Sequence, residues 1–368
     1  MNIGIPKEIK PQEERVAITP AGAHTLVLAG HRVLIERSAG VGAGFQDADY
    51  ARAGAEIVPD AAAVFGQARL ILKVKEPQPP ELALLTAEHL LFTYLHLAPE
   101  PELTRALMEI GLSAIAYETV QLPGGVLPLL LPMSEVAGRM SIQVGAHALE
   151  RHKGGRGVLL GGVPGVKPGR VVIVGGGTVG TNAAQMAVGL GADVTLLDNR
   201  IVRLAELDLA FQGRLKTRLS TPYGIAGELE GADLVVGAVL VAGALTPHLI
   251  TREMVRAMKP GAVVVDVAID QGGCAETSRA TTHEHPTFVE EGVVHYCVAN
   301  MPGAVARTAT LGLTNATLPY ALRLADAGLD ALRDDPALAA GLNVHRGHVV
   351  HPAVAAAQGL AAVPFGNA

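Results

Sequence analysis

The chain has 368 residues, of which 49% are hydrophobic and 3% aromatic, and it contains no Trp. One core rarely organises so long a chain, so we expect two domains with cores built from Ala, Val and Leu. The formal net charge of -6, without a basic tract, argues against a nucleic-acid partner.

Nothing in the sequence predicts export or membrane insertion. No charged segment followed by an apolar run opens the chain, so no secretory signal peptide is expected. The longest apolar run, residues 234–245, is too short to cross a bilayer, and we expect no membrane partner. Cys274 and Cys297 are the only cysteines, too few for a disulfide framework. A reduced, cytoplasmic protein is therefore expected.

Residues 2–121 alternate short β-branched runs with Ala-rich helical runs, a pattern typical of a parallel sheet with crossover helices. Thr19 and Asp60 are placed to cap two of these helices. The predicted strands are residues 3–5, 32–36, 56–58, 70–74, 90–94 and 113–117. This region is predicted to form one doubly wound unit without a glycine fingerprint.

Residues 123–132, rich in Gly and Pro, interrupt this pattern and mark a domain boundary. A helix is predicted at residues 134–153, and a second alternating region starts at Val171. Its later elements are a helix at 201–211 and strands at 216–219, 234–237, 262–267 and 293–298. Residues 303–332 are predicted to be helical, with a kink at Pro319, and the tail is expected to pack on the first domain.

Residues 171–198 predict a strand, a glycine turn, a helix, a second strand and an acid. Gly175, Gly177 and Gly180 form a GxGxxG pattern, which lets the backbone approach a pyrophosphate at a helix N-terminus. Asp198 stands where a carboxylate accepts hydrogen bonds from an adenosine ribose and repels a 2'-phosphate. The stretch predicts a dinucleotide site that favours NAD. Arg200 and Arg203 leave NADP open, and a βαβ unit that binds no dinucleotide is the alternative.

The fold class that follows is α/β, with two doubly wound Rossmann-like domains and a cleft between them. Residues 1–132 and 302–368 are expected to form a discontinuous substrate-binding and catalytic domain. Residues 133–301 are expected to form an NAD-binding Rossmann domain.

Charged residues follow two predicted strands of the first domain. Arg15 lies beyond the first strand and Lys75 at the end of the strand at 70–74, where parallel strands present their carboxyl ends. An Arg fork and a Lys point charge together suit a carboxylate. A solvated charged rim is the alternative interpretation.

Two titratable side chains also end predicted strands. His96 follows the strand at 90–94, and its unperturbed pKa near neutrality suits an acid/base group. Asp270 precedes a Gly pair and is placed to orient a water or an amine. The alternatives are a structural histidine and a turn aspartate that caps backbone. His345, His348 and His351 match no standard zinc spacing, and we expect no metal.

Two stretches resemble the alanine dehydrogenase and pyridine nucleotide transhydrogenase family. They are GIPKEIK at residues 4–10 with EERVAITP at 13–20, and residues 172–194 with the GGGxxG turn and LGA at 190–192. The resemblance covers essentially the whole chain. It implies NAD-dependent oxidative deamination of L-alanine to pyruvate and ammonium, and the reverse amination, by a homohexamer.

The resemblance also implies roles for individual residues. Arg15 and Lys75 hold the substrate carboxylate, with Tyr94, Met133 and Asn300 as pocket neighbours, while His96 and Asp270 are the catalytic pair across closing domains. The implied NAD contacts are Ser134, Gly175, Gly177, Thr178, Val179, Gly180, Asp198, Arg203, Ser220, Val239, Leu240, Val267, Ala268, Ile269, Asp270, Arg279, Val298 and Met301.

Three other functions share this pattern. The first is the nucleotide-binding subunit of a proton-translocating transhydrogenase, against which stands the stretch PMSEVAGRM at 132–140. The second is a related amino-acid dehydrogenase of the saccharopine type, whose bulky substrate does not suit a pocket lined by Tyr94, Leu130 and Met133. The third is a catalytically inactive NAD sensor, which the presence of His96 and Asp270 disfavours.

Overall fold

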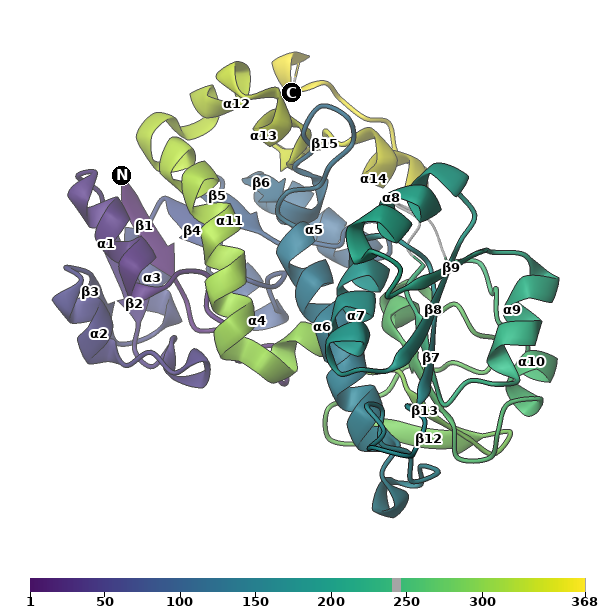
Figure 1. Cartoon of the computed structure of the whole chain (residues 1–368). Coiled ribbons are helices and arrows are strands. Elements are labelled where there is room, and N and C mark those ends of the chain that lie inside the picture. Colours follow the sequence, from purple (N-terminus) through teal and green to yellow (C-terminus); the bar gives the residue numbers. More distant parts are fainter. Residues whose placement is uncertain (240–245, 368) are drawn as a thin grey trace. The chain divides into compact units, whose positions relative to one another are not determined.

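The computed structural model describes residues 1–239 and 246–367 and divides the chain into two compact units (Figure 1). Unit 1 consists of Met1–Met133 and Gly303–Ala368, and unit 2 consists of Ser134–Pro302. Helix α6 (Leu131–Ala148) contains the passage from one unit to the next. Each unit is an α/β layer structure built on its own sheet.

The sheet of unit 1 has the strand order β15-β14-β6-β5-β4-β1-β2-β3. The strands β1 to β6 pair in parallel, and β14 and β15 add an antiparallel hairpin beside β6. The bounds are β1 (Asn2–Ile5), β2 (Arg32–Glu36), β3 (Glu56–Val58), β4 (Leu70–Leu72), β5 (Leu90–Thr93), β6 (Ser113–Ala116), β14 (Leu342–His345) and β15 (His348–Val349). The order 3-2-1-4-5-6 of the parallel strands is that of a doubly wound dinucleotide-binding fold.

The helices of unit 1 begin where the sequence supplies caps. Thr19 accepts a hydrogen bond from the Gly22 amide at the start of α1, and Asp60 accepts one from the Ala63 amide at the start of α3. The bounds are α1 (Pro20–Leu28), α2 (Asp47–Arg52), α3 (Ala61–Gln67), α4 (Pro79–Leu82), α5 (Pro101–Ile110), α11 (Ala306–Ala327), α12 (Ala331–Asp334), α13 (Pro336–Ala340) and α14 (Pro352–Ala357). Both caps agree with the sequence prediction.

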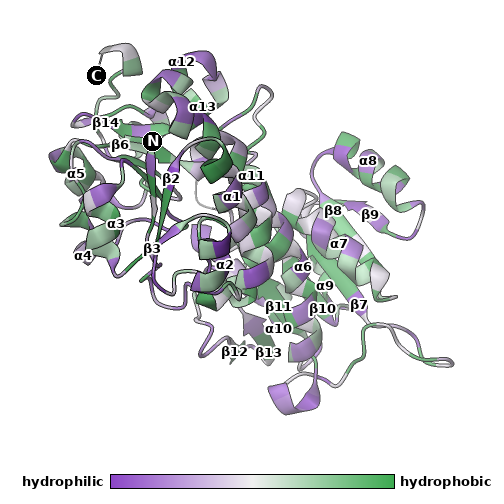
Figure 2. Ribbon diagram, turned by 90° about the vertical axis from the view of Figure 1, so that its left-hand side faces the viewer, coloured by the Kyte–Doolittle hydropathy of each residue, from purple (hydrophilic) through white to green (hydrophobic). Residues whose placement is uncertain are grey.

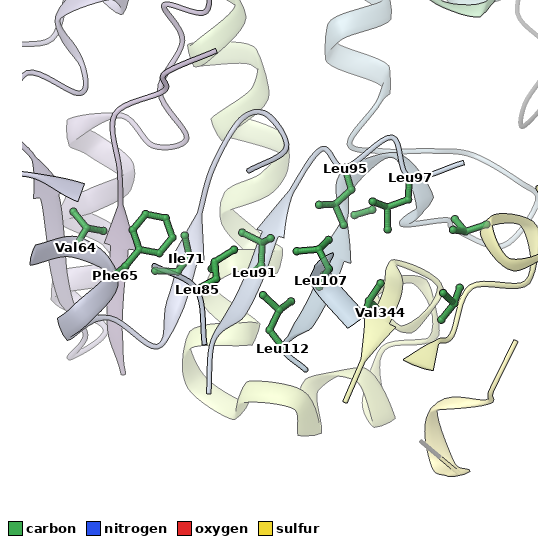
Figure 3. Packing of buried hydrophobic residues seen from close by; sticks show 14 of the residues in the cluster. Val64, Phe65, Ile71, Leu85, Leu91, Leu95, Leu97, Leu107, Leu112 and Val344 are labelled. Carbon is green, nitrogen blue, oxygen red and sulfur yellow. The ribbon is translucent and has the colours of Figure 1, made fainter. Parts of the chain in front are cut away.

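The core of unit 1 joins residues from both of its chain segments. Figure 3 shows Phe65, Leu91 and Leu107 in one apolar cluster with Val344 of β14. The Val16 amide also donates to Thr310 Oγ1 of α11 (3.2 Å). The C-terminal segment therefore packs on the first part of the chain, as the sequence predicts, because its strand and helix complete that core.

Unit 2 repeats the doubly wound order in a second sheet, β12-β13-β11-β10-β7-β8-β9. Its central strands β7, β10 and β11 are largely apolar and buried, as the green of the sheet in Figure 2 shows, because helices cover both faces of a parallel sheet. The strands are β7 (Arg170–Val174), β8 (Asp193–Asp198), β9 (Lys216–Leu219), β10 (Leu234–Gly237), β11 (Val263–Asp266), β12 (Thr287–Glu290) and β13 (Val293–Tyr296). The helices are α7 (Thr178–Gly189), α8 (Ile201–Phe211), α9 (Pro222–Leu229) and α10 (Arg252–Arg256).

The two sheets confirm the predicted α/β class of two doubly wound units, and the differences lie at strand ends. The strands predicted at 70–74 and 262–267 end at Leu72 and Asp266, because the chain leaves the sheet there although apolar Val74 and Val267 lie just beyond. The antiparallel strands β12, β14 and β15 were not predicted. Pro319 lies inside the continuous helix α11. No helix in the described part of the chain is long and apolar enough to cross a membrane.

The core of unit 1 supplies a stability test. Leu91 is fully buried in β5, so Leu91→Ala should lower the free energy of unfolding by about 2–5 kcal/mol through lost burial and a cavity. Leu28, at the end of α1, is 74% exposed, and Leu28→Ala should change it by less than about 0.5 kcal/mol. Urea unfolding followed by circular dichroism measures both, and equal losses would contradict the assigned core.

Candidate active site

The candidate residues of unit 1 lie in the loops that follow β1, β4 and β5. In a doubly wound sheet these strands end at one edge, beside the point where the strand order reverses between β1 and β4. Arg15 belongs to the loop after β1, Lys75 to the loop after β4 and His96 to the loop after β5. The topology therefore places the three predicted groups at one edge of one sheet.

Arg15 is a buried and oriented guanidinium. Its side chain is 2% exposed, and Glu13 accepts from Nε at 2.6 Å and from Nη2 at 2.5 Å. Arg15 Nη1 donates to the sulfur of Met133 at 3.1 Å. Burial opposes the charge, but the hydrogen bonds and charge of Glu13 outweigh burial and raise the pKa of Arg15. A solvated rim is therefore the wrong interpretation of Arg15.

A buried ion network fixes the loop after β1 onto β4. Lys73 is fully buried and donates to Glu8 Oε2 at 3.0 Å and to Glu81 Oε1 at 2.6 Å. Glu8 Oε1 accepts from the Val74 amide at 2.6 Å. Burial lowers the pKa of Lys73, but the two carboxylates outweigh burial and raise it. Lys73 and both oxygens of Glu8 thus have partners inside the protein, and Lys73 is a structural residue.

Lys75 is half-buried beside Arg15. Burial first, and then the positive charge of Arg15, lower the pKa of Lys75. Glu13 already pairs with Arg15, so an anion beside Lys75 would offset the charge of Lys75 and the repulsion from Arg15, and the carboxylate of a small substrate is such an anion. Tyr94 is buried nearby, donates to the Leu129 carbonyl at 2.5 Å and has its pKa raised by burial, so it stays a neutral phenol.

His96 is held in a left-handed backbone conformation, with φ of 51°. Glu118 supports this conformation, because its carboxylate accepts from the His96 amide at 2.7 Å and from the Leu95 amide at 3.2 Å. The imidazole stacks on the ring of Tyr94, with 5.8 Å between centroids. Strained backbone of this kind occurs at functional sites, where the surroundings hold a side chain in position.

In unit 2 the glycine turn joins β7 to α7 and leaves no room for a side chain at Gly175 or Gly180. Gly175 has φ of +107°, and a Cβ on Gly180 would lie 1.8 Å from the Gly175 oxygen. A Cβ on Gly177 would meet nothing within 4 Å, so this side of the turn is open. A pyrophosphate fits the turn because the backbone is accessible at the N-terminus of a 12-residue helix.

Asp198 ends β8 and supports the same turn. Its Oδ2 accepts from the Gly176 amide at 2.8 Å, and its Oδ1 accepts from the Arg200 amide at 2.9 Å. Burial raises the pKa of Asp198, but the hydrogen bonds outweigh burial and lower it. Arg203 donates to the Gly176 carbonyl at 2.7 Å and to Thr181 Oγ1 at 2.8 Å. Arg200 and Arg203, the two residues that could have served the 2'-phosphate of NADP, thus both have partners within the protein. This favours NAD as the cofactor.

Asp270 is exposed in a 3-10 turn (Val267–Gln271) that follows β11. The backbone around it is capped by Asp266, which is fully buried and accepts from the Ala268 amide at 3.1 Å and the Cys274 amide at 2.8 Å. Ser278 Oγ also donates to Asp266 at 2.6 Å. The capping role that was the alternative for Asp270 therefore belongs to Asp266.

The remaining predicted contacts of unit 2 lie on several elements. The Ser220 amide donates to the Asp198 carbonyl at 2.9 Å, and the guanidinium of Arg279 lies 4.2 Å from the Phe288 ring centroid. Asn300 has φ of 59°. Ser134 lies in α6, Thr178 and Val179 start α7, Val239 follows β10, Val267, Ala268 and Ile269 follow β11, and Val298 and Met301 follow β13. Leu240 lies outside the described residues.

Sequence reasoning missed the groups that hold these side chains. Glu13, Glu118 and Asp266 each fix a predicted site residue or its loop, and their only sequence signal is an acid at a strand end or in the segment that follows a strand. Gly138 was also missed: a Cβ there would lie 2.3 Å from the Val179 carbonyl, so it lets α6 approach the start of α7. Among the described residues, no group of three His, Cys, Asp or Glu side chains could hold a metal ion.

The fold and the glycine turn define a dinucleotide-binding α/β protein of two doubly wound units. Family models for the alanine dehydrogenase/PNT N-terminal domain and C-terminal domain match residues 4–137 and 141–352. The chain belongs to the alanine dehydrogenase and PNT family.

Its relatives include alanine dehydrogenases. The chain is 60% identical to the alanine dehydrogenase of Halomonas elongata, over 98% of this chain and 97% of that one. It is 57% identical to that of Bacillus subtilis, over 99% and 96%. A solved structure titled L-alanine dehydrogenase matches with a TM-score of 0.95 and 56% identity, over 98% and 99% of the two chains. A transhydrogenase from Sinorhizobium meliloti matches with a TM-score of 0.82 and 26% identity, over 96% and 100%.

The glycine turn supplies a binding test. Gly180→Ala places a methyl group against the Gly175 carbonyl and should raise the Kd for NADH about tenfold or more, which corresponds to about 1.4 kcal/mol. Gly189→Ala, at the other end of α7, meets nothing within 4 Å and should leave the Kd unchanged. Fluorescence titration with NADH measures both, and an unchanged Kd in Gly180→Ala would contradict the assigned pyrophosphate site.

Proposed function

We propose that the protein catalyses the NAD-dependent oxidation of L-alanine to pyruvate and ammonium, and the reverse reductive amination of pyruvate. The observation that carries the proposal is the edge of the unit 1 sheet. There the buried Arg15 and the half-buried Lys75 bring two cations together, which suits a carboxylate, and the acid/base candidate His96 follows the neighbouring strand. The near-full-length identity to alanine dehydrogenases supports this substrate over other small acids.

Arg15 and Lys75 hold the substrate by its carboxylate. Glu13 fixes the fork of Arg15 before substrate arrives, so little side-chain entropy is lost on binding. The depressed pKa of Lys75 reflects a cation that gains from an incoming anion. Both residues contribute mainly to binding and orientation, and a fixed carboxylate directs the alpha carbon of alanine.

The family resemblance assigns the proton transfers to His96, in the loop after β5, and to Asp270, in the turn after β11. Bound NAD supplies the hydride acceptor. Loss of hydride from the alpha carbon and of a proton from nitrogen converts alanine to iminopyruvate. His96 and Asp270 then assist the addition of water to the imine carbon and the protonation of nitrogen, which leaves as ammonia. The net change is alanine, NAD⁺ and water to pyruvate, ammonium, NADH and a proton.

The second candidate is the nucleotide-binding subunit of a transhydrogenase, which shares the fold. The structural match to a transhydrogenase is at 26% identity, whereas the match to the L-alanine dehydrogenase structure is at 56%. A transhydrogenase passes hydride between nucleotides. That reaction does not require a buried guanidinium such as Arg15 to bind a small carboxylate. Alanine oxidation is therefore the better supported function.

Consumption of NADH tests the proposal directly. Purified protein with pyruvate, ammonium and NADH should oxidise NADH. The loss of NADH is followed by its absorbance at 340 nm. His96→Ala should lower kcat about 100-fold or more, because it removes an acid/base group, and should leave NADH binding unchanged. Folded protein that consumes no NADH would overturn the proposal, and full activity in His96→Ala would overturn the role of His96.

The family resemblance also supports a homohexamer that works in the cytoplasm. Apolar side chains exposed in the single chain, such as Leu159 and Val163, are candidates for burial between subunits. Light scattering should give a mass of about six times the 38.0 kDa of one chain. A concentration-independent monomer mass would contradict this assembly.

A further inference from the structure

Glu76 lies between Lys10 and the imidazole of His96. It belongs to the loop after β4, and its Oε1 forms an ion pair with Lys10 Nζ. Its Oε2 lies 3.9 Å from His96 Nδ1. This oxygen is buried and has no hydrogen-bond partner in the part of the chain that the structure describes. One oxygen of a largely buried carboxylate is thus satisfied, and the other points toward the histidine.

At 3.9 Å the carboxylate of Glu76 and the imidazole of His96 interact electrostatically, although they are too far apart for a hydrogen bond. A buried carboxylate oxygen without a donor is unfavourable, and a shift of about 1 Å brings 3.9 Å to hydrogen-bond distance. The side chain of His96 is 45% exposed and can make this shift, whereas that of Glu76 is 14% exposed and held by Lys10. Catalytic hydrogen bonds are often long without substrate and shorten when it binds.

The rest of His96 is already fixed. Glu118 accepts from its backbone amide at 2.7 Å, and Tyr94 stacks on one face of the ring at 5.8 Å between centroids. A carboxylate on the Nδ1 side adds a further restraint on rotation of the ring about its Cβ–Cγ bond.

We infer that Glu76 is a positioning residue for His96: its Oε2 accepts a hydrogen bond from Nδ1–H, which leaves Nε2 as the nitrogen that exchanges protons with the substrate. The inference rests on the proposed function. A carboxylate behind an acid/base histidine selects the tautomer and stabilises the imidazolium that forms during proton transfer. Glu76 also raises the proton affinity of His96 through its charge.

Other charges around His96 must be weighed with Glu76. Glu118 contacts the backbone of His96, Lys10 pairs with Glu76, and Lys75 lies in the same loop as Glu76. Burial raises the pKa of Glu76, but the hydrogen bond and charge of Lys10 outweigh burial and lower it. Glu76 is therefore an anion at neutral pH, and Lys10 partly offsets its effect on the imidazole.

Substitutions of Glu76 and of its partner Lys10 should shift the pH dependence of kcat/KM in opposite directions. Glu76→Gln removes the negative charge. The acidic limb of the pH profile of kcat/KM for alanine oxidation should therefore move to lower pH by about one unit. Its plateau kcat should fall about tenfold because the ring is no longer held. Lys10→Met removes the offsetting charge and should move the limb to higher pH. Glu76→Asp keeps the charge and should leave the limb near its wild-type position while kcat falls.

The control is Glu109→Gln, an exposed acid in α5 that removes the same bulk charge and should leave the limb in place. If Glu76 serves only to hold the loop through Lys10, Glu76→Gln and Lys10→Met will both lose stability without opposite shifts of the limb. A limb that is unchanged in Glu76→Gln, or that moves the same way in Glu76→Gln and Lys10→Met, overturns the inference.

A second readout separates this inference from the proposed function. Nuclear magnetic resonance of histidine Cε1–H, with His96 assigned by His96→Gln, follows the titration of the imidazole without substrate. The titration midpoint should fall in Glu76→Gln and rise in Lys10→Met. These shifts in a protein that does not oxidise alanine would overturn the proposed function but support the coupling. Alanine oxidation without these shifts would overturn the coupling alone.

Discussion

The burial of Lys73 is the constraint on which the rest of unit 1 depends. An ammonium group that is fully buried at the end of β4 is stable only when carboxylates surround it, and Glu8 and Glu81 supply them from two other segments. Glu8 lies in the loop after β1, so the ion network fastens that loop to β4. Arg15 is seven residues further along the same loop, and Lys75 is two residues beyond Lys73. The ion network therefore fixes the segments of chain that carry Arg15 and Lys75.

The same device recurs at the other loops. Glu118 accepts the amides of Leu95 and His96, Asp266 accepts amides on both sides of Asp270, and Asp198 accepts the Gly176 amide. In each case backbone amides of a loop donate hydrogen bonds to a carboxylate, and these bonds shape the loop that carries a candidate functional group. Hydrogen bonds from backbone to a carboxylate are strong and directional, so they fix loops that have no sheet partners.

The two units share a strand order but differ in the segment that follows their first strand, and local sterics are one reason. Unit 2 has glycines where a Cβ would strike the backbone, as at Gly180, and the resulting turn exposes amides at the start of α7. Unit 1 has charged side chains at the corresponding edge and no glycine turn. One sheet edge thus suits a pyrophosphate and the other a small carboxylate, although the topologies agree.

The sequence by itself determined the elements that depend on local pattern. β-branched runs predicted the parallel strands, and the spacing of Gly175 and Gly180 predicted the turn, because side-chain period and glycine sterics act over a few residues. Only the tertiary structure decided which of two nearby acids caps the turn after β11, since Asp266 and Asp270 differ in burial and not in residue type. It also decided the antiparallel strands and the partners of Lys73, because these contacts join segments far apart in the chain and depend on which charges the fold removes from water.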